Sequence, residues 1–501
     1  MAANSRRRAI IIAVVAVVCV VVLLHRHQMT DFEQSVNYPL SQKKMFFTWP
    51  DENPIPETTA LQKMSIEEIS NLYFKYVNTL QVFCPRKKVY GGVRSGWYTC
   101  DVIRKGTSCV AYLIAQYITK NFFEELKQDY GCEENVIRKS VLDAAKNTPT
   151  TEGYSQFTNL QLKGDIDYMA IDIGGGETQL LSWMLKQDLL RNVDQLLVSF
   201  HGISADSNET VYIEHMQVLQ ALYKGGFRTF HFARNVQCLF KQSWRKTGCY
   251  SLYMIRNLPI NNPIEVYDRE TINTKPLKDL TTLYNSLLLS SQIHCKEVIR
   301  IGKVDDGGWD VCNDLEYRPS SPCLVYSFGV AGDWSFDDEV ARIYGCEVHS
   351  FDPSIGKNDH RRSDKITFHN LGLWGKPKGK KGKWNMMNMK EIIEMLGHTE
   401  KIIDIMKMDI EWSEWEAIPD MLASGVLKNV RQLDFEFHGG PNFKEELRSR
   451  LISLRGINEQ GFRLFWSHPN IMGGNPTKSS LTGRELSACN ENYYLNINLR
   501  K

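Results

Sequence analysis

Apolar and polar positions alternate along the second half of the chain in a way that predicts a series of strands and helices. Short apolar runs bounded by turn residues predict strands, and runs with apolar residues every three to four positions predict helices. The expected strands are 324–329, 346–351, 366–371, 402–410, 432–437, 462–467 and 493–499, and the expected helices are 334–344, 389–396, 414–423 and 443–455. This alternation predicts a mostly parallel sheet with helices on both faces.

The N-terminus carries a different pattern, an unbroken apolar run of 16 residues over 9–24 that follows Arg6, Arg7 and Arg8. Its flanks extend it toward the roughly 17 residues that a membrane-spanning helix needs. No small-x-small cleavage motif follows, so an uncleaved signal anchor over 9–27 is expected rather than the alternative, a cleaved signal peptide. The arginines are expected to hold a tail over 1–8 in the cytosol. The chain is then a single-pass type II membrane protein with a stem over 28–64.

Self-comparison shows that the chain contains an internal repeat. Residues 166–202 align with residues 403–439 without a gap, and 16 of the 37 aligned positions are identical. Unrelated segments of this length match at about two or three positions. The sequence therefore predicts a degenerate first copy over 65–258, a linker over 259–275 and a second copy over 276–501.

Composition and charge exclude several classes of protein. A chain of 501 residues with 43% hydrophobic and 24% charged residues is neither a disordered tail nor a coiled coil. The formal net charge of +2 provides no basic face for DNA or RNA, so no nucleic-acid partner is expected. Eleven of the twelve cysteines lie outside the anchor, and a glycosylation sequon begins at Asn208. Both features indicate a lumenal or extracellular location in the secretory pathway, with the Golgi as one candidate compartment.

Cysteines at matching positions of the two copies predict disulfide bonds. The expected local pairings are Cys84 with Cys100 and Cys295 with Cys312, while the full connectivity stays open. A zinc site is the alternative, but the chain lacks the pair of C-x-x-C motifs typical of one. No metal site is therefore predicted.

A turn of small residues in the second copy is the first candidate for ligand binding. It runs through Gly329, Gly332 and Asp333, between an expected strand and an expected helix, where glycines let the backbone approach a ligand. About twenty residues further on, Asp352 ends the next strand, and a carboxylate there can accept the hydroxyl groups of a ribose. The pattern indicates a nucleoside-containing cofactor, either NAD or S-adenosylmethionine. Its glycine spacing is not the G-x-G-x-x-G of a dinucleotide site.

These segments resemble a known family. GGWDVCND (307–314), VYSFGVAGDWSFD (325–337), YGCEVHSFDPS (344–354) and DIMKMDIEWSEW (404–415) resemble the methyltransferase-like protein 24 family, which has a class I methyltransferase domain. The last segment is also distantly similar to FkbM-type O-methyltransferases. The resemblance implies a Rossmann-like α/β domain with S-adenosylmethionine as the cofactor, and the internal repeat then predicts two such domains in tandem. It places Gly329, Gly332 and Asp333 near the methionine part of the cofactor and Asp352 at the ribose.

The first copy is an internal control for these assignments. At the positions of the four cofactor residues it has Ala115, Ile118, Thr119 and Arg138, so it is not expected to bind the cofactor. Its glycine-rich segment DIGGGET (172–178) is expected to be a loop after the fourth strand.

The same comparison sorts the polar residues of the second copy. Asp404, Asp409, Glu414 and His438 recur in the first copy, which favours structural roles. Lys407 and Glu411 become Ala170 and Gly174, which favours chemistry. Lys407 is a candidate for neutralising an acceptor oxyanion and Glu411 for taking its proton, with a solvated ion pair as the alternative. Asp409 stays a catalytic candidate because it ends the fourth strand.

The predicted function is a membrane-anchored, S-adenosylmethionine-dependent methyltransferase, with transfer to oxygen favoured. The second copy is expected to be catalytic and the first non-catalytic, and the acceptor is a small molecule, a glycan or a protein. One alternative is a type II Golgi glycosyltransferase in which Asp165 and Asp167 hold Mn²⁺, although the second copy has Ile402 at the first of these positions. The other alternative is a catalytically inactive scaffold.

Overall fold

The computed structural model describes most of the chain after residue 53. The described residues are 54–92, 96–102, 108–116, 120–138, 162, 164–241, 245–256, 261–439, 446–470 and 476–501. The expected anchor, the stem up to residue 53, Ile118 and Thr119 lie outside them. Within these residues, no helix combines the length and the apolar character that crossing a membrane requires.

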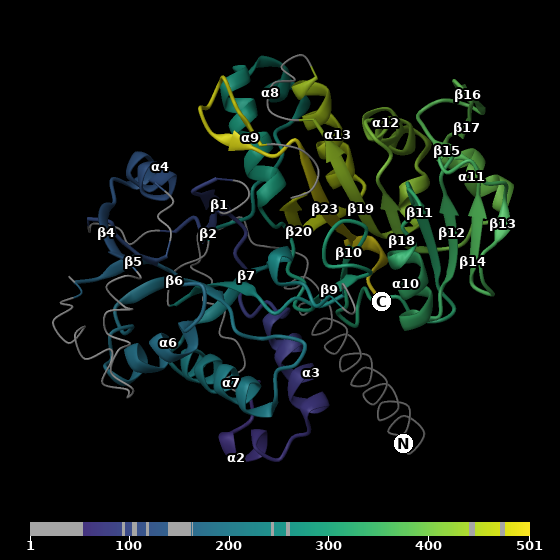
Figure 1. Cartoon of the computed structure of the whole chain (residues 1–501). Helices are drawn as coiled ribbons and strands as arrows, with labels where there is room; N and C mark the ends of the chain where they lie inside the picture. The colour runs from purple at the N-terminus through teal and green to yellow at the C-terminus, as the bar shows by residue number, and fades with distance from the viewer. Residues whose placement is uncertain are drawn as a thin grey trace, which may run out of the picture. The chain divides into compact units, whose positions relative to one another are not determined.

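An eight-stranded sheet is the centre of the C-terminal half. Across the sheet the strands are β13 (His360–Arg361), β14 (Ile366–His369), β12 (Glu347–Phe351), β11 (Leu324–Phe328), β18 (Ile403–Met408), β19 (Val430–His438), β23 (Cys489–Asn496) and β20 (Phe462–Pro469) (Figure 1). The neighbours from β14 to β19 are parallel, whereas β23 is antiparallel to both β19 and β20. The expected parallel α/β arrangement is therefore confirmed for the strands that end at the candidate site.

Apolar side chains cover both faces of this sheet. On one face, residues such as Phe328, Met408 and Phe435 belong to a buried cluster with five helices. These helices are α8 (Arg269–Thr274), α9 (Leu277–Leu289), α11 (Met389–Leu396), α12 (Glu414–Ser424) and α13 (Leu447–Glu459). On the other face, Val325 and Ile405 pack in a cluster with α10 (Ser335–Tyr344) and the antiparallel pair β9 (Val298–Ile301) and β10 (Trp309–Cys312). This second face carries the candidate site at its carboxyl edge.

The N-terminal half contains a six-stranded sheet with a matching strand order. Its strands are β4 (Glu133–Arg138), β3 (Val110–Ala115), β5 (Ile166–Asp172), β6 (Val193–Phe200), β8 (Tyr250–Ile255) and β7 (Arg228–Arg234). Its helices are α2 (Thr58–Leu61), α3 (Ile66–Val77), α4 (Lys120–Tyr130), α6 (Glu177–Lys186) and α7 (Glu209–Lys224), and β1 (Lys87–Tyr90) pairs with β2 (Trp97–Cys100). The order corresponds to that of β12, β11, β18, β19, β23 and β20 in the larger sheet.

Buried side chains make matching contacts in the two halves. The Gln195 amide bonds the backbone N–H and C=O of Cys100, at 2.8 and 2.9 Å, and Gln432 does the same to Cys312, at 2.9 and 3.0 Å. Each glutamine thereby holds a short antiparallel strand pair against its sheet. Such contacts explain why these glutamines recur in the sequence repeat.

Five disulfide bonds lie within the described residues. They join Cys84 to Cys100, Cys109 to Cys132, Cys238 to Cys249, Cys295 to Cys312, and Cys323 to Cys346. The two local pairings expected from the sequence are confirmed. Cys489, which aligns with Cys249, is a free and buried thiol.

Element boundaries depart from the predictions mainly near the C-terminus. The expected strand 493–499 is instead β23, which starts at Cys489 because its ladder with β19 already begins at the pair His438 and Cys489. It ends at Asn496, and a 3₁₀ turn follows at Ile497–Leu499. Three small sheets were not predicted, because strands of two to four residues are too short to show periodicity. They are β9–β10, β15 (Gly372–Leu373) with β17 (Trp384–Met387) and β16 (Gly379–Lys381), and β21 (Thr477–Lys478) with β22 (Glu485–Leu486).

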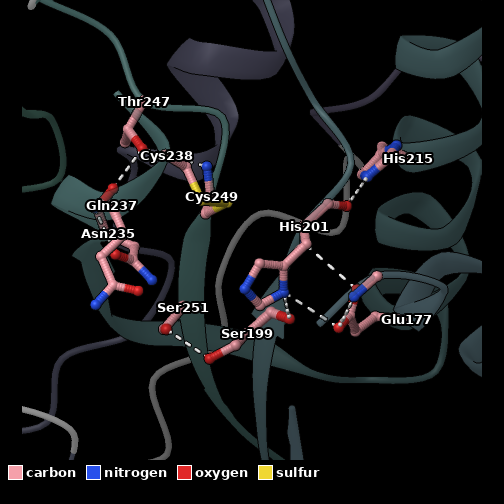
Figure 2. The surroundings of a disulfide bond; sticks show 11 residues. Glu177, Ser199, His201, His215, Asn235, Gln237, Cys238, Thr247, Cys249 and Ser251 are labelled. Carbon is pink, nitrogen blue, oxygen red and sulfur yellow. Dashed lines mark hydrogen bonds and ion pairs between the residues drawn. A yellow bond between two sulfur atoms is a disulfide. The ribbon is translucent and has the colours of Figure 1, made fainter. Parts of the chain in front are cut away.

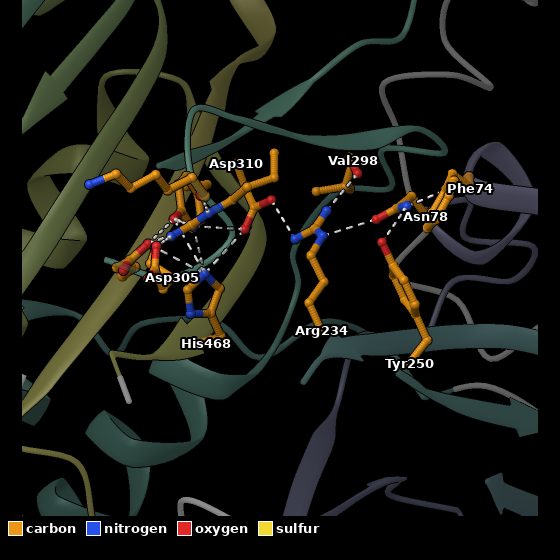
Figure 3. A network of polar contacts seen from close by, with 12 residues as sticks. Phe74, Asn78, Arg234, Tyr250, Val298, Asp305, Asp310 and His468 are labelled. Carbon is orange, nitrogen blue, oxygen red and sulfur yellow. Dashed lines mark hydrogen bonds and ion pairs between the residues drawn. The ribbon is translucent and has the colours of Figure 1, made fainter. Parts of the chain in front are cut away.

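A buried carboxylate organises the charged residues beside β10. Asp310 has no exposed surface and accepts hydrogen bonds from Arg234 at 2.7 Å, Arg300 at 3.3 Å and His468 at 3.1 Å (Figure 3). Arg300 also pairs with Glu491 at 3.0 Å. Burial alone would raise the pKa of Asp310, but the two guanidinium groups outweigh burial and hold this pKa well below its ordinary value.

We expect Asp310→Asn to lower the free energy of unfolding by about 3 kcal/mol, because it leaves buried guanidinium charge without its partner. A depressed folded-state pKa stabilises the protein above the unfolded value of about 3.9, and this contribution is lost as the pH falls toward the folded value. The difference in the free energy of unfolding between wild type and variant should therefore have its full size near pH 6 and become smaller below pH 4. Urea unfolding at a series of pH values measures it, and a difference independent of pH would contradict the assignment.

Candidate active site

The turn between β11 and α10 brings the backbone of three residues into left-handed conformations. Gly329, Ala331 and Gly332 have φ values of +76°, +49° and +84°. A Cβ on Gly329 would lie 1.6 Å from the carbonyl oxygen of Asp409, so the turn packs directly against the end of β18. A Cβ on Gly332 would meet nothing within 4 Å, so this side of the turn borders open space. The turn is therefore held from one side and accessible from the other.

Asp352 ties the end of β12 to this turn. Its Oδ2 accepts the N–H of Ala331 at 2.7 Å, and its Oδ1 accepts the N–H and the hydroxyl of Ser354 at 2.7 and 2.6 Å. The residue is 4% exposed. A carboxylate offers about four acceptor positions, so one position on Oδ2 stays available for a ribose hydroxyl. A second hydroxyl would have to displace the hydroxyl of Ser354.

Asp333 connects the start of α10 to the loop after β9. It pairs with Lys303 at 2.6 Å and accepts the N–H of Ser335 at 2.9 Å. Burial alone would raise the pKa of Asp333, but these hydrogen bonds and the charge of Lys303 lower it. The carboxylate is therefore an ionised cap at the first turn of α10, next to the glycine turn.

Lys407 lies on β18 beneath the same turn. The residue is 5% exposed, and its ammonium group donates to the carbonyl oxygens of Phe328, at 3.2 Å, and Gly329. Its charge lowers the pKa values of the nearby carboxyl groups of Asp337 and Asp409, which burial raises more strongly. Lys407 is thus neither exposed nor part of a solvated ion pair, and it positions the glycine turn.

His438, at the end of β19, stands at the centre of a group of carboxylates. Its Nδ1 bonds Glu414 at 3.0 Å, and its Nε2 lies 3.4 Å from Glu411 and 4.0 Å from both Asp409 and Glu436. Burial lowers the pKa of His438, but the hydrogen bond and charge of Glu414 and the charges of Glu436 and Asp409 raise it to about 9. Burial raises the pKa of Asp409 to about 6. Asp409 can therefore exchange a proton near neutral pH.

Glu411 and Trp412 form a strained turn at the mouth of this site. Their φ values are +51° and +73°, in a region that side chains other than glycine rarely adopt. The aligned residues of the N-terminal half, Gly174 and Gly175, have φ values of +64° and +113°. The same left-handed backbone is therefore built from glycine in one half and from a carboxylate and an indole in the other. Strain of this kind concentrates at functional sites.

Comparison with known proteins now identifies this half of the chain. Residues 264–481 match the family model described as "Methyltransferase domain". This part of the chain is therefore similar to a methyltransferase domain. The match contains the glycine turn, Asp352 and the carboxylate group around His438.

Two curated relatives confirm the resemblance noted in the sequence. The human "Probable methyltransferase-like protein 24" is 28% identical over 180 residues, which cover 32% of this chain and 49% of the relative. Its rat counterpart is 26% identical over 220 residues, which cover 40% of this chain and 60% of the relative. The chain thus spans about half of the relatives' length. A Haemonchus contortus phosphoethanolamine N-methyltransferase 2 in complex with S-adenosyl-L-methionine covers 72% of this chain and 80% of its own at 10% identity, with a TM-score of only 0.21.

The residues of the methyltransferase domain fit the cofactor that the family uses. Open space beside Gly332 leaves the backbone of the turn accessible, and Asp352 keeps one acceptor position for a ribose hydroxyl. In the N-terminal half, Ala115 ends β3 and Arg138 ends β4, where neither offers a carboxylate, and Ile118 and Thr119 lie outside the described residues. The DIGGGET segment lies between β5 and α6, which confirms its interpretation as a loop after a later strand.

Several recurring residues have the structural roles expected for them. Asp404 accepts the N–H of Leu324 at 3.1 Å, and Asp167 accepts the N–H of Val110 at 2.9 Å. Asp167 is only 5% exposed. Its carboxylate therefore holds a neighbouring strand, which leaves the Mn²⁺ role of the glycosyltransferase alternative without a structural basis.

Sequence comparison missed two acids of the methyltransferase domain. Asp434 and Glu436 are 0% and 4% exposed on β19 and point to the same face as His438, because they alternate with it along the strand. Burial raises the pKa of Glu436 to about 8 and that of Asp434 well above its ordinary value. Their aligned residues are Leu197 and Ser199. Lys407 and Glu411 were selected because their aligned residues in the N-terminal half are not ionisable. The same criterion would have selected these two acids.

We expect Glu411→Gly to raise the free energy of unfolding by about 1 kcal/mol, because glycine relieves the left-handed strain at this position. The side chain of Glu411 is 80% exposed, so little packing is lost. Glu411→Ala is the matched control, because it removes the same carboxylate but keeps a Cβ in the strained turn. Chemical unfolding of both variants measures the difference. Equal stability of the two would show that strain contributes nothing.

Proposed function

We propose that this protein is an S-adenosylmethionine-dependent methyltransferase whose C-terminal half is catalytic and transfers a methyl group to oxygen. The observation that carries the proposal is the methyltransferase-domain match over residues 264–481, in which the accessible glycine turn and Asp352 lie together. When bound, the cofactor supplies an electrophilic methyl group. The work left to the protein is to hold donor and acceptor in line and to remove a proton.

Each part of that work has a candidate residue. Asp352 holds a ribose hydroxyl, and Lys407 fixes the carbonyls at the end of β11 so that the turn keeps its shape. Asp409, with a pKa raised to about 6, and the exposed Glu411 face the space beside His438, where they can take the proton of a hydroxyl acceptor. A hydroxyl group must lose its proton when it is methylated, so the presence of these two carboxylates supports transfer to oxygen.

The N-terminal half is proposed to be a second, non-catalytic copy of the same domain. The equal strand order of the two sheets and the matching glutamine contacts support a tandem duplication. Ala115 and Arg138 stand where the catalytic half has Gly329 and Asp352, so this half lacks the ribose carboxylate. Its role is then structural or in acceptor binding.

The protein is further proposed to be a type II membrane protein whose body lies in the lumen of the secretory pathway or outside the cell. The apolar run over 9–24 behind three arginines supports the anchor. The five disulfide bonds support an oxidising compartment. Asn208 is exposed at the start of α7, which suits a glycosylated position. No nucleic-acid partner is proposed.

Calorimetric titration of S-adenosylmethionine into the detergent-solubilised full chain tests the proposal. We expect one site per chain, with Asp352→Ala weakening the affinity at least tenfold because the ribose loses its acceptor. Asp364→Ala is the control, because that carboxylate is fully exposed in the same half. Absence of binding by the folded wild-type chain would leave the scaffold alternative. Equal affinity of both variants would remove Asp352 from the site.

A further inference from the structure

A set of metal-ligating side chains occupies the carboxyl edge of β19 and β23. Glu436, His438 and Cys489 are 4%, 6% and 8% exposed, and their ligand atoms lie within 4.8 Å of one another. His438 and Cys489 are a direct pair across the two strands, and Glu436 stands two residues before His438 on the same face. A carboxylate, an imidazole and a thiol are all ligands of divalent transition metals.

The histidine of this set is oriented as a metal ligand. Glu414 accepts from Nδ1 of His438 at 3.0 Å, and the same Glu414 oxygen accepts the backbone N–H of Ile410 at 3.0 Å. A histidine whose Nδ1–H is held by a carboxylate directs Nε2 at a metal ion that displaces the Nε2 proton, and this is the usual second-shell arrangement of metal-bound histidines. Nε2 faces Glu436 and Asp409, each at 4.0 Å.

A second observation points to a cation-binding site at the same place. Oδ1 of Asp409, the atom 4.0 Å from Nε2 of His438, is buried and accepts no hydrogen bond from any described residue. Four carboxylates lie within 4.0 Å of the His438 ring, and they outnumber the His438 side chain and Lys407, whose charge also acts on Asp409.

The N-terminal half shows the same framework without two of the four donors. His201 still bonds Glu177 at 3.1 Å, as His438 bonds Glu414 (Figure 2). At the position of Glu436 stands Ser199, whose hydroxyl bonds Ser251 at 2.8 Å. The residue aligned with Cys489, Cys249, is consumed in the disulfide with Cys238 (Figure 2). The histidine–glutamate pair and the aspartate, Asp172 or Asp409, are therefore common to both halves, and the Glu436 carboxylate and the free thiol of Cys489 are particular to the C-terminal half.

We propose that Asp409, Glu436, His438 and Cys489 form a binding site for one divalent transition-metal ion, with zinc favoured by the imidazole and thiolate donors. Binding exchanges the Cys489 S–H bond for a sulfur–metal bond, and it releases to solvent this proton together with the Nε2 proton of His438 and the carboxyl proton of Glu436. An ion at this edge would bind the acceptor oxygen and lower the pKa of its hydroxyl group, and the exposed Glu411 would then take the proton. That catalytic role rests on the proposed methyl transfer, whereas metal binding itself does not.

Metal analysis of the full chain tests this site independently of any methyl acceptor. The chain is purified without chelators, its zinc content is measured by mass spectrometry, and the apoprotein is titrated with Co²⁺ to detect the thiolate-to-cobalt absorption band. We expect one metal per chain, a lost thiolate band in Cys489→Ser and affinity at least tenfold weaker in Glu436→Gln. Glu414→Gln should weaken affinity about 10- to 100-fold, as removal of a second-shell partner does.

A rival cluster in the same half provides the control. Glu347, His349 and His398 also bring ligand atoms within 4.8 Å of one another, so His349→Gln should leave metal content unchanged. Metal that is lost in His349→Gln but kept in Cys489→Ser would overturn the proposal, as would a folded wild-type chain that binds no stoichiometric metal. Titration with S-adenosylmethionine is recorded on the same samples. Intact cofactor binding without metal would refute the metal site alone, and metal binding without cofactor binding would refute the methyltransferase proposal alone.

Discussion

Replacing Gly329 by alanine is expected to lower the free energy of unfolding by about 4 kcal/mol or more, which is exceptional for a single methyl group. Two effects add. An alanine at φ +76° is strained, and its Cβ would lie 1.6 Å from the carbonyl oxygen of Asp409. The end of β11 and the end of β18 would have to separate, which moves both the cofactor turn and a candidate proton acceptor. Urea unfolding measures the stability, and calorimetry measures the accompanying loss of S-adenosylmethionine binding.

Gly332→Ala is the matched control for this prediction. Gly332 has a similar φ of +84°, but a Cβ there would meet nothing within 4 Å. Only the left-handed strain remains, so the expected cost is about 1–2 kcal/mol. Equal destabilisation by the two substitutions would mean that the contact between the turn and Asp409 does not hold the site together.

Lys407→Met is expected to lower the free energy of unfolding by about 3–5 kcal/mol, because it removes the cation from a buried set of acids. Methionine retains the length of the side chain, so the loss is one of charge and hydrogen bonding. The carbonyl oxygens of Phe328 and Gly329 lose their donor, and Asp337 and Asp409 lose a positive neighbour. Affinity for S-adenosylmethionine should fall at least tenfold, because the turn is no longer fixed.

Lys401→Met is the control for the loss of a lysine charge in the same half. The side chain of Lys401 is 51% exposed and lies 4.0 Å from Glu347, so its removal should change stability by no more than about 0.5 kcal/mol. Unfolding in urea and calorimetric titration give both quantities for both variants. A Lys407→Met protein with wild-type affinity for the cofactor would show that Lys407 stabilises the buried acids but does not fix the shape of the glycine turn.

Much of the fold could be predicted from the sequence because its strands are buried on both faces and are broken by strong turn residues. Helix α11 was predicted at its observed bounds, since Asn388 and Glu391 form a capping box at its start and Gly397 ends it. The pairings of Cys84 with Cys100 and of Cys295 with Cys312 could be predicted because the partners are local in sequence. The short pair β9–β10 could not, although it covers the face of the sheet that carries Lys407.

The candidate site was harder to predict because its geometry depends on contacts between distant segments. Nothing in the sequence shows that Asp409 packs against Gly329, or that Cys489 lies opposite His438, since those pairings follow from strand register. The strained backbone of Glu411 is equally invisible until φ is known. Alignment of the two halves did contain a signal for Glu436, because the aligned residue of the N-terminal half is a serine, Ser199.

The salt bridge between Arg234 and Asp310 makes the stability of the C-terminal half depend on a residue of the N-terminal half. Arg234 belongs to the N-terminal half, and Asp310 is buried beside the sheet of the C-terminal half. A shortened chain that begins after residue 258 would lack Arg234. Asp310 would then lose one of its two guanidinium partners and the burial that the N-terminal half provides. Selection for a stable C-terminal half would therefore also preserve the part of the N-terminal half that presents Arg234.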